Sequence, residues 1–355
     1  MAIVATYRAV VQGAEAIRRY RKSTIRETLS ATGRRTGSIG QCRGSSPHRA
    51  IGICLPKPLD SEDALCVGFF EQLWRGIGHQ ADLESCRVLH CPPEADDRNS
   101  ADSLIAAPLS GVILRSYHAE RAAALVRAGG RAILLCRPVV VPEGCIAVHA
   151  NEQETVDLAL SHLWNLGHRR IAYVAGPVGT RDRAWGAGPE SVAGAEGDGC
   201  AIGRLDSYQT WMWRRQAYDP QLVELNGSWF LTAAVPALER WMRLASPPTA
   251  IFCANDALAI KYVSAAESLG LRIPGDLSIV GVDDSQEARD CTPALTSVQV
   301  PLEEIARAGI SALIASLGHH VQSASIELHV HTISVRASTG PPRRTEPAQR
   351  MLPAS

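Results

Sequence analysis

Two pairs of polar residues follow short apolar runs in the last third of the chain. Asn255 and Asp256 come directly after "IFCA", and Asp283 and Asp284 come directly after "LSIVGV". Uninterrupted apolar runs of this kind are typical of strands in a parallel sheet. Ligands of such sheets bind beyond the carboxyl ends of the strands, where carboxylate and amide groups can hydrogen-bond to ligand hydroxyls. We therefore expect Asn255 and Asp283 to bind a small hydroxylated molecule.

A second explanation applies to the first pair. The segment "DALAIKYVSAAESLG" predicts a helix that begins at Asp256 and stops at Gly270, so Asp256 could be its N-cap. The segment after Asp284 contains Pro293 and has little helical periodicity. Capping therefore does not account for the second pair.

Short apolar runs alternate with helical patterns along most of the chain. The segment "EQETVDLALSHLWNL" (152–166) has an apolar stripe and is followed by Gly167, which predicts a helix that ends there. Alternation of this kind predicts an α/β fold in which helices cover both faces of parallel sheets. The predicted strands are residues 51–55, 111–114, 131–136, 171–176, 250–254 and 277–282.

The charge is distributed unevenly although the formal net charge of the 355 residues is zero. Residues 1–50 contain ten Lys and Arg residues, against only two acidic residues, Glu15 and Glu27. Such an asymmetry predicts a basic headpiece that binds a polyanion, and the alternative is a disordered basic tail. A chain of this length with 46% hydrophobic residues is large enough for two domains with cores of their own.

Several classes of protein are disfavoured by missing motifs. The ten cysteines form no C-x-x-C pair, which argues against a zinc site and favours a reducing cytoplasm over secretion. The start "MAIVATYRAV" offers no export signal, and no apolar run approaches the roughly 18 residues of a membrane span. The sequence has no G-x-G-x-x-G, P-loop, H-E-x-x-H or G-x-S-x-G motif, and His162 and His168 are expected to be structural. We expect no enzymatic activity, no cofactor and no metal.

Three segments resemble the LacI/GalR family of bacterial transcription regulators. They are "LGHRRIAYVAGP" (166–177), the long run from "FCANDALAIKY" to "ISALIASL" (252–317), and "IELHVHTISVRASTGPP" (326–342). The resemblance covers about residues 51–342, and the motifs are specific in combination and in order. It implies two Rossmann-like lobes of the type I periplasmic-binding-protein kind, between which the chain crosses three times. The implied parts are a remnant helix-turn-helix and hinge segment (1–50), an N-terminal lobe (51–167 plus 296–318), a C-terminal lobe (168–295 plus 319–340) and a disordered tail (341–355).

The resemblance also implies which residues bind the effector. The family's effector contacts fall on Asn255, Asp283, Arg204 of "RLDSY" and Trp229 of "NGSWF". An Arg fork can make paired hydrogen bonds, and an indole face can cover the apolar side of a sugar or base. The alternatives are a surface ion pair for Arg204 and a core position for Trp229.

The sequence departs from the family in three places. "PKPLDSEDALCVGFF" (56–70) replaces the usual Asn-Pro-aromatic turn, and Asn151 of "VHANEQET" (148–155) stands at a position where the family has Asp. The Gly- and Ala-rich segment 178–203 is longer than the usual connection and predicts an inserted loop. These departures bear on the identity of the effector.

The basic head resembles part of the family's DNA-binding motif. "VATYRAVVQG" (4–13) is similar to the recognition helix, which puts Thr6, Tyr7 and Arg8 on the DNA-facing side, and "STIRETLSATG" (23–33) is similar to the third helix. The sequence opens at Met1, where the recognition helix is expected to begin, so we expect the first helix of the motif to be absent, and the hinge segment 36–46 contains three glycines that disfavour a helix. Either the true start lies upstream, or the protein has lost specific operator binding and keeps a basic arm.

The family mechanism then follows as an expectation. A homodimer binds operator DNA, and a sugar or nucleoside between the lobes changes the separation of the headpieces. The competing hypothesis is a small-molecule sensor of the same fold without specific DNA binding.

Overall fold

The computed structural model describes residues 49–56, 67–91, 109–179, 197–229, 232–330 and 332–343. The chain divides into two units, Met1–Arg49 and Ala50–Ser355, and the description concerns the second. The predicted DNA-facing residues Thr6, Tyr7 and Arg8 lie outside the described residues, as do residues 344–355 of the predicted tail.

The first sheet is parallel throughout, with the strand order β11-β5-β4-β3-β1-β2. Its central strands read "AIGIC", "GVILR" and "AILL", and the residues of β3 and β4 are all buried. Both faces of these strands are therefore covered, which explains why their sequences are apolar without alternation. The strands are β1 (Ala50–Cys54), β2 (Arg87–His90), β3 (Gly111–Arg115), β4 (Ala132–Leu135), β5 (Ile146–Ala150) and β11 (Ala324–Leu328).

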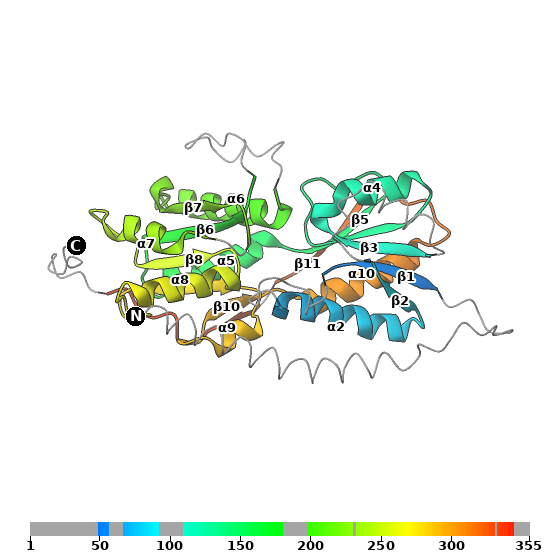
Figure 1. Cartoon of the computed structure of the whole chain (residues 1–355). Helices are drawn as coiled ribbons and strands as arrows, with labels where there is room; N and C mark the ends of the chain where they lie inside the picture. The colour runs from blue at the N-terminus through cyan, green and yellow to red at the C-terminus, as the bar shows by residue number, and fades with distance from the viewer. Residues whose placement is uncertain are drawn as a thin grey trace. The chain divides into compact units, whose positions relative to one another are not determined.

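Helices lie on the two faces of this sheet. Alternate residues of β3 contact different apolar clusters: Val112 and Leu114 pack with Leu125 of α4, whereas Ile113 packs on the side of α2 and α10. The helices α2 and α10 lie against each other (Figure 1). The helices of this part are α2 (Val67–Leu83), α4 (Ala119–Arg127) and α10 (Leu302–Ser316), with the short 3-10 helix η2 (Ser116–His118) before α4.

The second sheet has the strand order β12-β10-β9-β8-β6-β7, and only β12 is antiparallel to its neighbour. Its strands are β6 (Ile171–Pro177), β7 (Val223–Asn226), β8 (Ala250–Cys253), β9 (Ser278–Val282), β10 (Thr296–Gln299) and β12 (Thr332–Ser334). The helices around it, labelled in Figure 1, are α5 (Glu152–Asn165), α6 (Gly199–Arg214), α7 (Ala234–Met242), α8 (Asp256–Ser268) and α9 (Gln286–Asp290). The predicted fold class, α/β with two Rossmann-like lobes of the type I periplasmic-binding-protein kind, is confirmed.

The chain passes between the two sheets three times, but not at the predicted boundaries. Helix α5 packs on α6 and on strands of the second sheet, although residues 51–167 were assigned to the first lobe. Strand β10 pairs with β9, so residues 296–299 also belong to the second sheet. Strand β11 pairs with β5 of the first sheet, although 319–340 was assigned to the second lobe. In each case the neighbouring strand or helix decides to which lobe the segment belongs. The local sequence does not reveal that neighbour.

The crossings are short, and two of them are joined by hydrogen bonds. The first runs from β5 to α5 through Asn151, and the last runs from β11 to β12. The amide of Asn151 donates to the carbonyl of Leu328 at 2.9 Å, and its side chain donates to Glu327 Oε1 at 2.9 Å. The amide of Val330 donates to Glu154 Oε2 at 2.7 Å. Asn151 also caps α5, because its Oδ1 accepts the amide of Glu154 at 3.0 Å.

The predicted loop at 178–203 is only partly correct. Residues 180–196 lie outside the described residues, whereas the last residues of the segment form the first turn of α6. Asp198 begins this helix, since its side chain accepts the amides of Cys200 and Ala201. None of the helices in the described ranges is both long and apolar enough to cross a membrane.

Two glycines of α2 allow a matched test of the packing between α2 and α10. A Cβ at Gly76 would lie 2.9 Å from Ala306 Cβ and still closer to the carbonyl of Glu303, whereas a Cβ at Gly78 would meet nothing within 4 Å. Gly76→Ala should therefore lower the free energy of unfolding by about 1–3 kcal/mol through overpacking. Gly78→Ala should raise it by about 0.5–1 kcal/mol, because alanine favours the helix. Urea unfolding of both variants measures the difference, and equal effects would contradict the packing.

Candidate functional site

The two polar pairs lie side by side at the carboxyl ends of β8 and β9, which pair with each other. Asn255 is the N-cap of α8, since its Oδ1 accepts the amide of Leu258 at 2.9 Å. Its Nδ2 donates to the carbonyl of Trp229 at 3.2 Å. The expectation that Asp256 caps this helix is wrong, and the residue before it does so. Asn255 thus has structural partners for both ends of its side-chain amide.

Asp256 fastens the loop after β9 to the core. Its carboxylate accepts the amide of Ser285 at 2.8 Å and the hydroxyl of Ser297 at 2.6 Å, and the residue is 1% exposed. Burial and the nearby charge of Asp283 raise the pKa of Asp256 well above its ordinary value. These hydrogen bonds give the Asp256 carboxylate a structural role.

Asp284 has cationic partners within the second sheet. Its carboxylate pairs with Arg289 Nη2 at 2.8 Å and also with Arg336, which follows β12. These contacts fix the segment that leaves β9 against the end of the chain's last strand. Like Asp256, Asp284 is held by contacts within the protein.

Asp283 differs from the other three residues. It is buried, yet its carboxylate makes no hydrogen bond or ion pair with any described residue. Burial raises the pKa of Asp283 to about 7 from an ordinary 3.8, a rise that the charge of Arg204 opposes and that of Glu152 supports. The backbone of Asp283 is in an unusual region, with φ of 107°. Strain and an unpaired buried carboxylate are features that functional sites retain.

Arg204 is held beside Asp283 by a buried ion pair. Its Nε donates to Glu152 Oε2 at 2.6 Å, its Nη1 donates to the carbonyl of Ala254, and the residue is 5% exposed. Burial alone would lower the pKa of Arg204, but the carboxylates of Glu152 and Asp283 raise it above its ordinary value. The alternative of a surface ion pair is therefore wrong, because both partners are buried.

Trp229 lies next to Arg204 at the same edge. The guanidinium carbon of Arg204 is 5.8 Å from the centre of the indole ring, within the range of a cation–π contact. The ring also packs on Gly176, where any Cβ would overlap it. Trp229 is half-buried, which differs from a core aromatic residue. The structure thus brings together all four residues predicted to bind the effector.

A second cluster at the ends of the first sheet's strands was not predicted. Arg115 ends β3 and is 6% exposed. Its Nη1 donates to Cys136 Sγ at 2.7 Å, and its Nη2 lies 3.6 Å from Asp198 Oδ2 at the start of α6. Its guanidinium carbon is 4.8 Å from the ring centre of Phe69. A charged residue directly after "GVIL" is the same signal that identified the acidic pairs, and it could have identified Arg115.

The two sheets meet at these strand ends. Arg115 of the first sheet contacts Asp198, the N-cap of α6, which packs on the second sheet, and Gln72 Nε2 of α2 donates to the carbonyl of Asp283 at 3.4 Å. The Nε of Arg115 and the hydroxyl of Ser116 are buried and have no hydrogen-bond partner within the described part of the chain. Unsatisfied buried polar groups are costly and call for a ligand, water or functional explanation. The arrangement can bind a polar molecule through one carboxylate, two guanidinium groups and an indole face.

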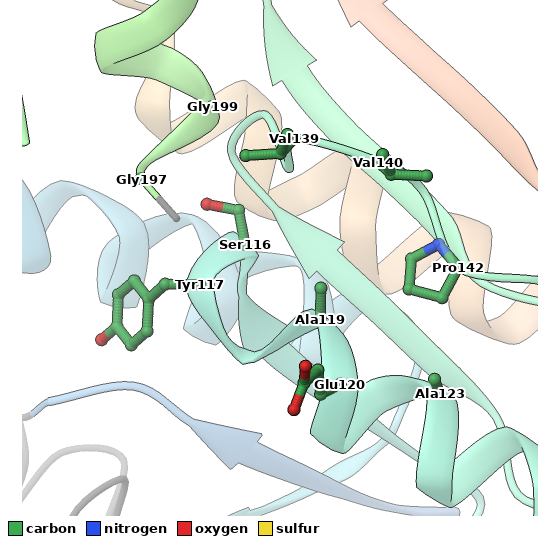
Figure 2. Close-up of a pocket in the computed structure, with 10 residues that line it drawn as sticks. All are labelled: Ser116, Tyr117, Ala119, Glu120, Ala123, Val139, Val140, Pro142, Gly197 and Gly199. Atoms are coloured by element: carbon green, nitrogen blue, oxygen red, sulfur yellow. The ribbon is translucent and has the colours of Figure 1, made fainter. Parts of the chain in front are cut away.

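A cavity of about 400 Å³ opens at Ser116, the residue that follows Arg115 (Figure 2). Ser116 and Tyr117 line it from η2 and Glu120 from α4, and Gly197 and Gly199 line it from the start of α6. Val139, Val140 and Pro142 complete an apolar wall. Among the described residues, no cluster of three or more His, Cys, Asp or Glu side chains could hold a metal ion.

The raised pKa of Asp283 predicts a pH-dependent stability. Because the pKa of Asp283 is higher in the folded protein than in the unfolded chain, protonation of this carboxyl stabilises the folded state, fully so below about pH 4. This stabilisation is lost as the pH rises through about 7, where the buried carboxyl loses its proton. Asp283→Asn removes the charge, so the variant should exceed the wild type in free energy of unfolding by on the order of 2–4 kcal/mol at about pH 8. The difference should shrink toward pH 4.

Denaturant unfolding at both pH values provides the measurement, and Asp290→Asn serves as the control because Asp290 is exposed. A variant that is less stable than the wild type at pH 8 would show that the Asp283 carboxylate has a stabilising partner.

Comparison with known proteins agrees with this architecture. Residues 160–339, slightly more than half of the chain, match the family described as periplasmic binding protein-like domain. The HTH-type transcriptional repressor CytR of Escherichia coli strain K12 is 28% identical over 281 residues, which is 78% of this chain and 76% of CytR.

Solved structures show the same fold. A complex of the transcriptional regulator CelR with cellobiose superimposes with a TM-score of 0.66 at 22% identity, covering 82% of this chain and 86% of CelR. The lac repressor dimer bound to operator and the anti-inducer ONPF superimposes with a TM-score of 0.64 at 22% identity, covering 82% of each chain. The predicted resemblance is confirmed, and the chain belongs to the periplasmic binding protein-like family.

Proposed function

We propose that this chain is a transcriptional regulator whose affinity for operator DNA is set by a small hydroxylated effector, a sugar or a nucleoside. The observation that carries the proposal is the buried Asp283 carboxylate, which has no hydrogen-bond partner among the described residues, although it interacts with the charge of Arg204, which in turn contacts Trp229. A buried carboxylate without a partner is costly, so a ligand that donates hydrogen bonds to it is strongly favoured.

The chemistry of the neighbouring side chains supports the class of effector. Asp283 would accept hydrogen bonds from adjacent hydroxyls of the effector. The guanidinium of Arg204 keeps donors beyond those that Glu152 and Ala254 occupy. Trp229 would stack on the apolar face of a sugar ring or a base. Asn255 would contribute through its remaining lone pair and N–H, since the helix cap and the Trp229 carbonyl use the others.

Binding of the effector would be coupled to binding of DNA. The strand ends of both sheets meet at the site, so a molecule bound there contacts both and favours one relative position of the sheets. In a homodimer this change would alter the separation of the DNA-binding segments that contain Thr6, Tyr7 and Arg8. The similarity to the repressor CytR supports this role, and we propose that the chain works in the cytoplasm without enzymatic activity.

A second function is a small-molecule sensor of the same fold that lacks specific DNA binding. The glycine-rich hinge segment at 36–46 favours it, because glycines weaken the helix that the family uses at this place. The two functions share the effector site and differ only in DNA binding.

The effector site is tested by thermal shift and calorimetry with cellobiose, ribose, cytidine and adenosine on the full chain. At least one compound should raise Tm and bind, and Asp283→Ala should weaken its affinity by at least about tenfold, because a hydrogen bond to a charged group is lost. Asp290→Ala, an exposed aspartate, should bind like the wild type. An effector that binds Asp283→Ala with unchanged affinity would contradict the site.

The role in transcription is tested by the binding of the full chain to fragments of its own genome. A specific fragment should bind with an affinity that falls steeply with salt. Arg8→Ala should reduce the slope of log affinity against log salt concentration by about one, as expected for the loss of one phosphate contact. The effector from the first experiment should change the affinity by about 5- to 150-fold. If effector binds but no fragment is selected at any salt concentration, the sensor function is correct.

A further inference from the structure

Two thiols from different sheets meet beside the candidate site. Cys136 directly follows β4 of the first sheet, and Cys200 lies in the first turn of α6, which packs on the second sheet. The two side chains lie close enough to shift each other's pKa, and both residues are buried. Neither cysteine forms a disulfide in this structure.

The surrounding contacts hold the two thiols in place. Arg115 Nη1 donates to Cys136 Sγ at 2.7 Å, and the amide of Arg137 donates to Cys200 Sγ at 3.3 Å. The first turn of α6 approaches the segment after β4 so closely that a Cβ on Gly199 would lie 2.6 Å from the carbonyl carbon of Pro138. The segments that carry the sulfurs are thus packed backbone against backbone.

The environment makes the two thiols chemically unequal. The hydrogen bond from Cys200 and the charge of Arg115 lower the pKa of Cys136, although burial opposes them. The pKa of Cys200 is raised well above its ordinary value by the hydrogen bond to Cys136 and by burial. A thiolate beside an arginine, with a second thiol nearby, is the arrangement of redox-sensitive cysteine pairs.

We propose that Cys136 and Cys200 are a peroxide-responsive pair that forms a reversible disulfide between the two sheets. The Cys136 thiolate attacks one oxygen of a hydroperoxide, the O–O bond breaks, and the alcohol leaves after it takes up a proton. The sulfenic acid on Cys136 is then attacked by Cys200, an S–S bond forms, and water leaves with the Cys200 proton. Two thiols are oxidised by two electrons, and the hydroperoxide is reduced to an alcohol and water.

The cavity beside Arg115 gives the oxidant a route. Gly199, which precedes Cys200, and Val139, which lies three residues after Cys136, both line the cavity of about 400 Å³ (Figure 2). A small hydroperoxide in this cavity would therefore lie near the segments that carry both cysteines, which are themselves 5% and 7% exposed.

A second thiol pair provides an internal control. Cys54 ends β1 and Cys91 follows β2, and these thiols also shift each other's pKa. The hydrogen bond from Cys54 lowers the pKa of Cys91 to about 7. Both residues belong to the first sheet, so a bond between them would not join the two sheets. Among the cysteines that the structure describes, Cys136 and Cys200 are the two whose mutual influence on the pKa joins a segment of the first sheet to a helix that packs on the second.

The regulatory consequence rests on the proposed function. A bond between Cys136 and Cys200 would fix the relative position of the sheets covalently, as an effector does by binding. The oxidised protein would then respond weakly or not at all to an effector. Formation of the bond itself does not depend on DNA binding or on the identity of the effector.

The experiment oxidises the full chain with tert-butyl hydroperoxide and maps the peptides by mass spectrometry without reduction. A peptide that joins Cys136 to Cys200 should appear in the wild type and in Cys91→Ser, and dithiothreitol should remove it. The oxidised Cys91→Ser protein should have a higher Tm than its reduced form, because the cross-link restricts the unfolded chain. Cys136→Ser and Cys200→Ser should show neither the peptide nor the rise in Tm.

The role of Arg115 separates a tuned thiol pair from two thiols that are merely close. Arg115→Met should form the cross-link roughly tenfold more slowly, because the thiolate fraction of Cys136 falls, and Arg115→Lys should restore most of the rate. Oxidation of Cys136 to sulfinic acid without the cross-linked peptide would overturn the proposal. A cross-link that forms only between other cysteines would do the same.

Discussion

The buried ion pair between Arg204 and Glu152 is the interaction on which the candidate site depends. It joins the first turn of α5 to the middle of α6, and a further hydrogen bond from Arg204 reaches the end of β8. Removing water from both charges costs several kcal/mol per ion, and a close pair with additional hydrogen bonds offsets that cost. Loss of either partner would leave a buried charge uncompensated. The guanidinium that faces Asp283 is therefore fixed before any ligand arrives.

The four polar residues at the ends of β8 and β9 show how one sequence signal can have two causes. Asn255, Asp256 and Asp284 have partners within the protein: the first turn of α8, the hydroxyl and amide of two serines, and two arginines. Asp283 has nearby charges but no hydrogen bond from its carboxylate to the described residues. The composition of the pairs does not distinguish these cases. The partners come from distant segments, and they decide which residue is available to a ligand.

Six of the strands and the helices α5 and α8 could be predicted because their evidence is local. Buried strands such as "GVILR" need apolar side chains on both faces, and a glycine with φ of 105° follows the C-cap of α5. Membership of the two sheets could not be predicted at the same level, because α5 and β10 are assigned by what they pack against. Arg115, Cys136 and Cys200 were missed for a related reason. Their meeting requires two sheets to face each other, and no spacing in the sequence encodes that contact.

Asn151 has a consequence for how the molecule can bend. It lies in the first crossing between the sheets, caps α5, and hydrogen-bonds to both the backbone and a side chain near the last crossing. Two connections that are tied in this way must rotate together, so the sheets have one shared axis of motion near Asn151 in place of two independent joints. A substitution at this position would alter the elastic stiffness of that axis while every side chain around Asp283 stays the same. The ease with which the sheets move when a ligand binds could therefore change in evolution separately from which ligand is bound.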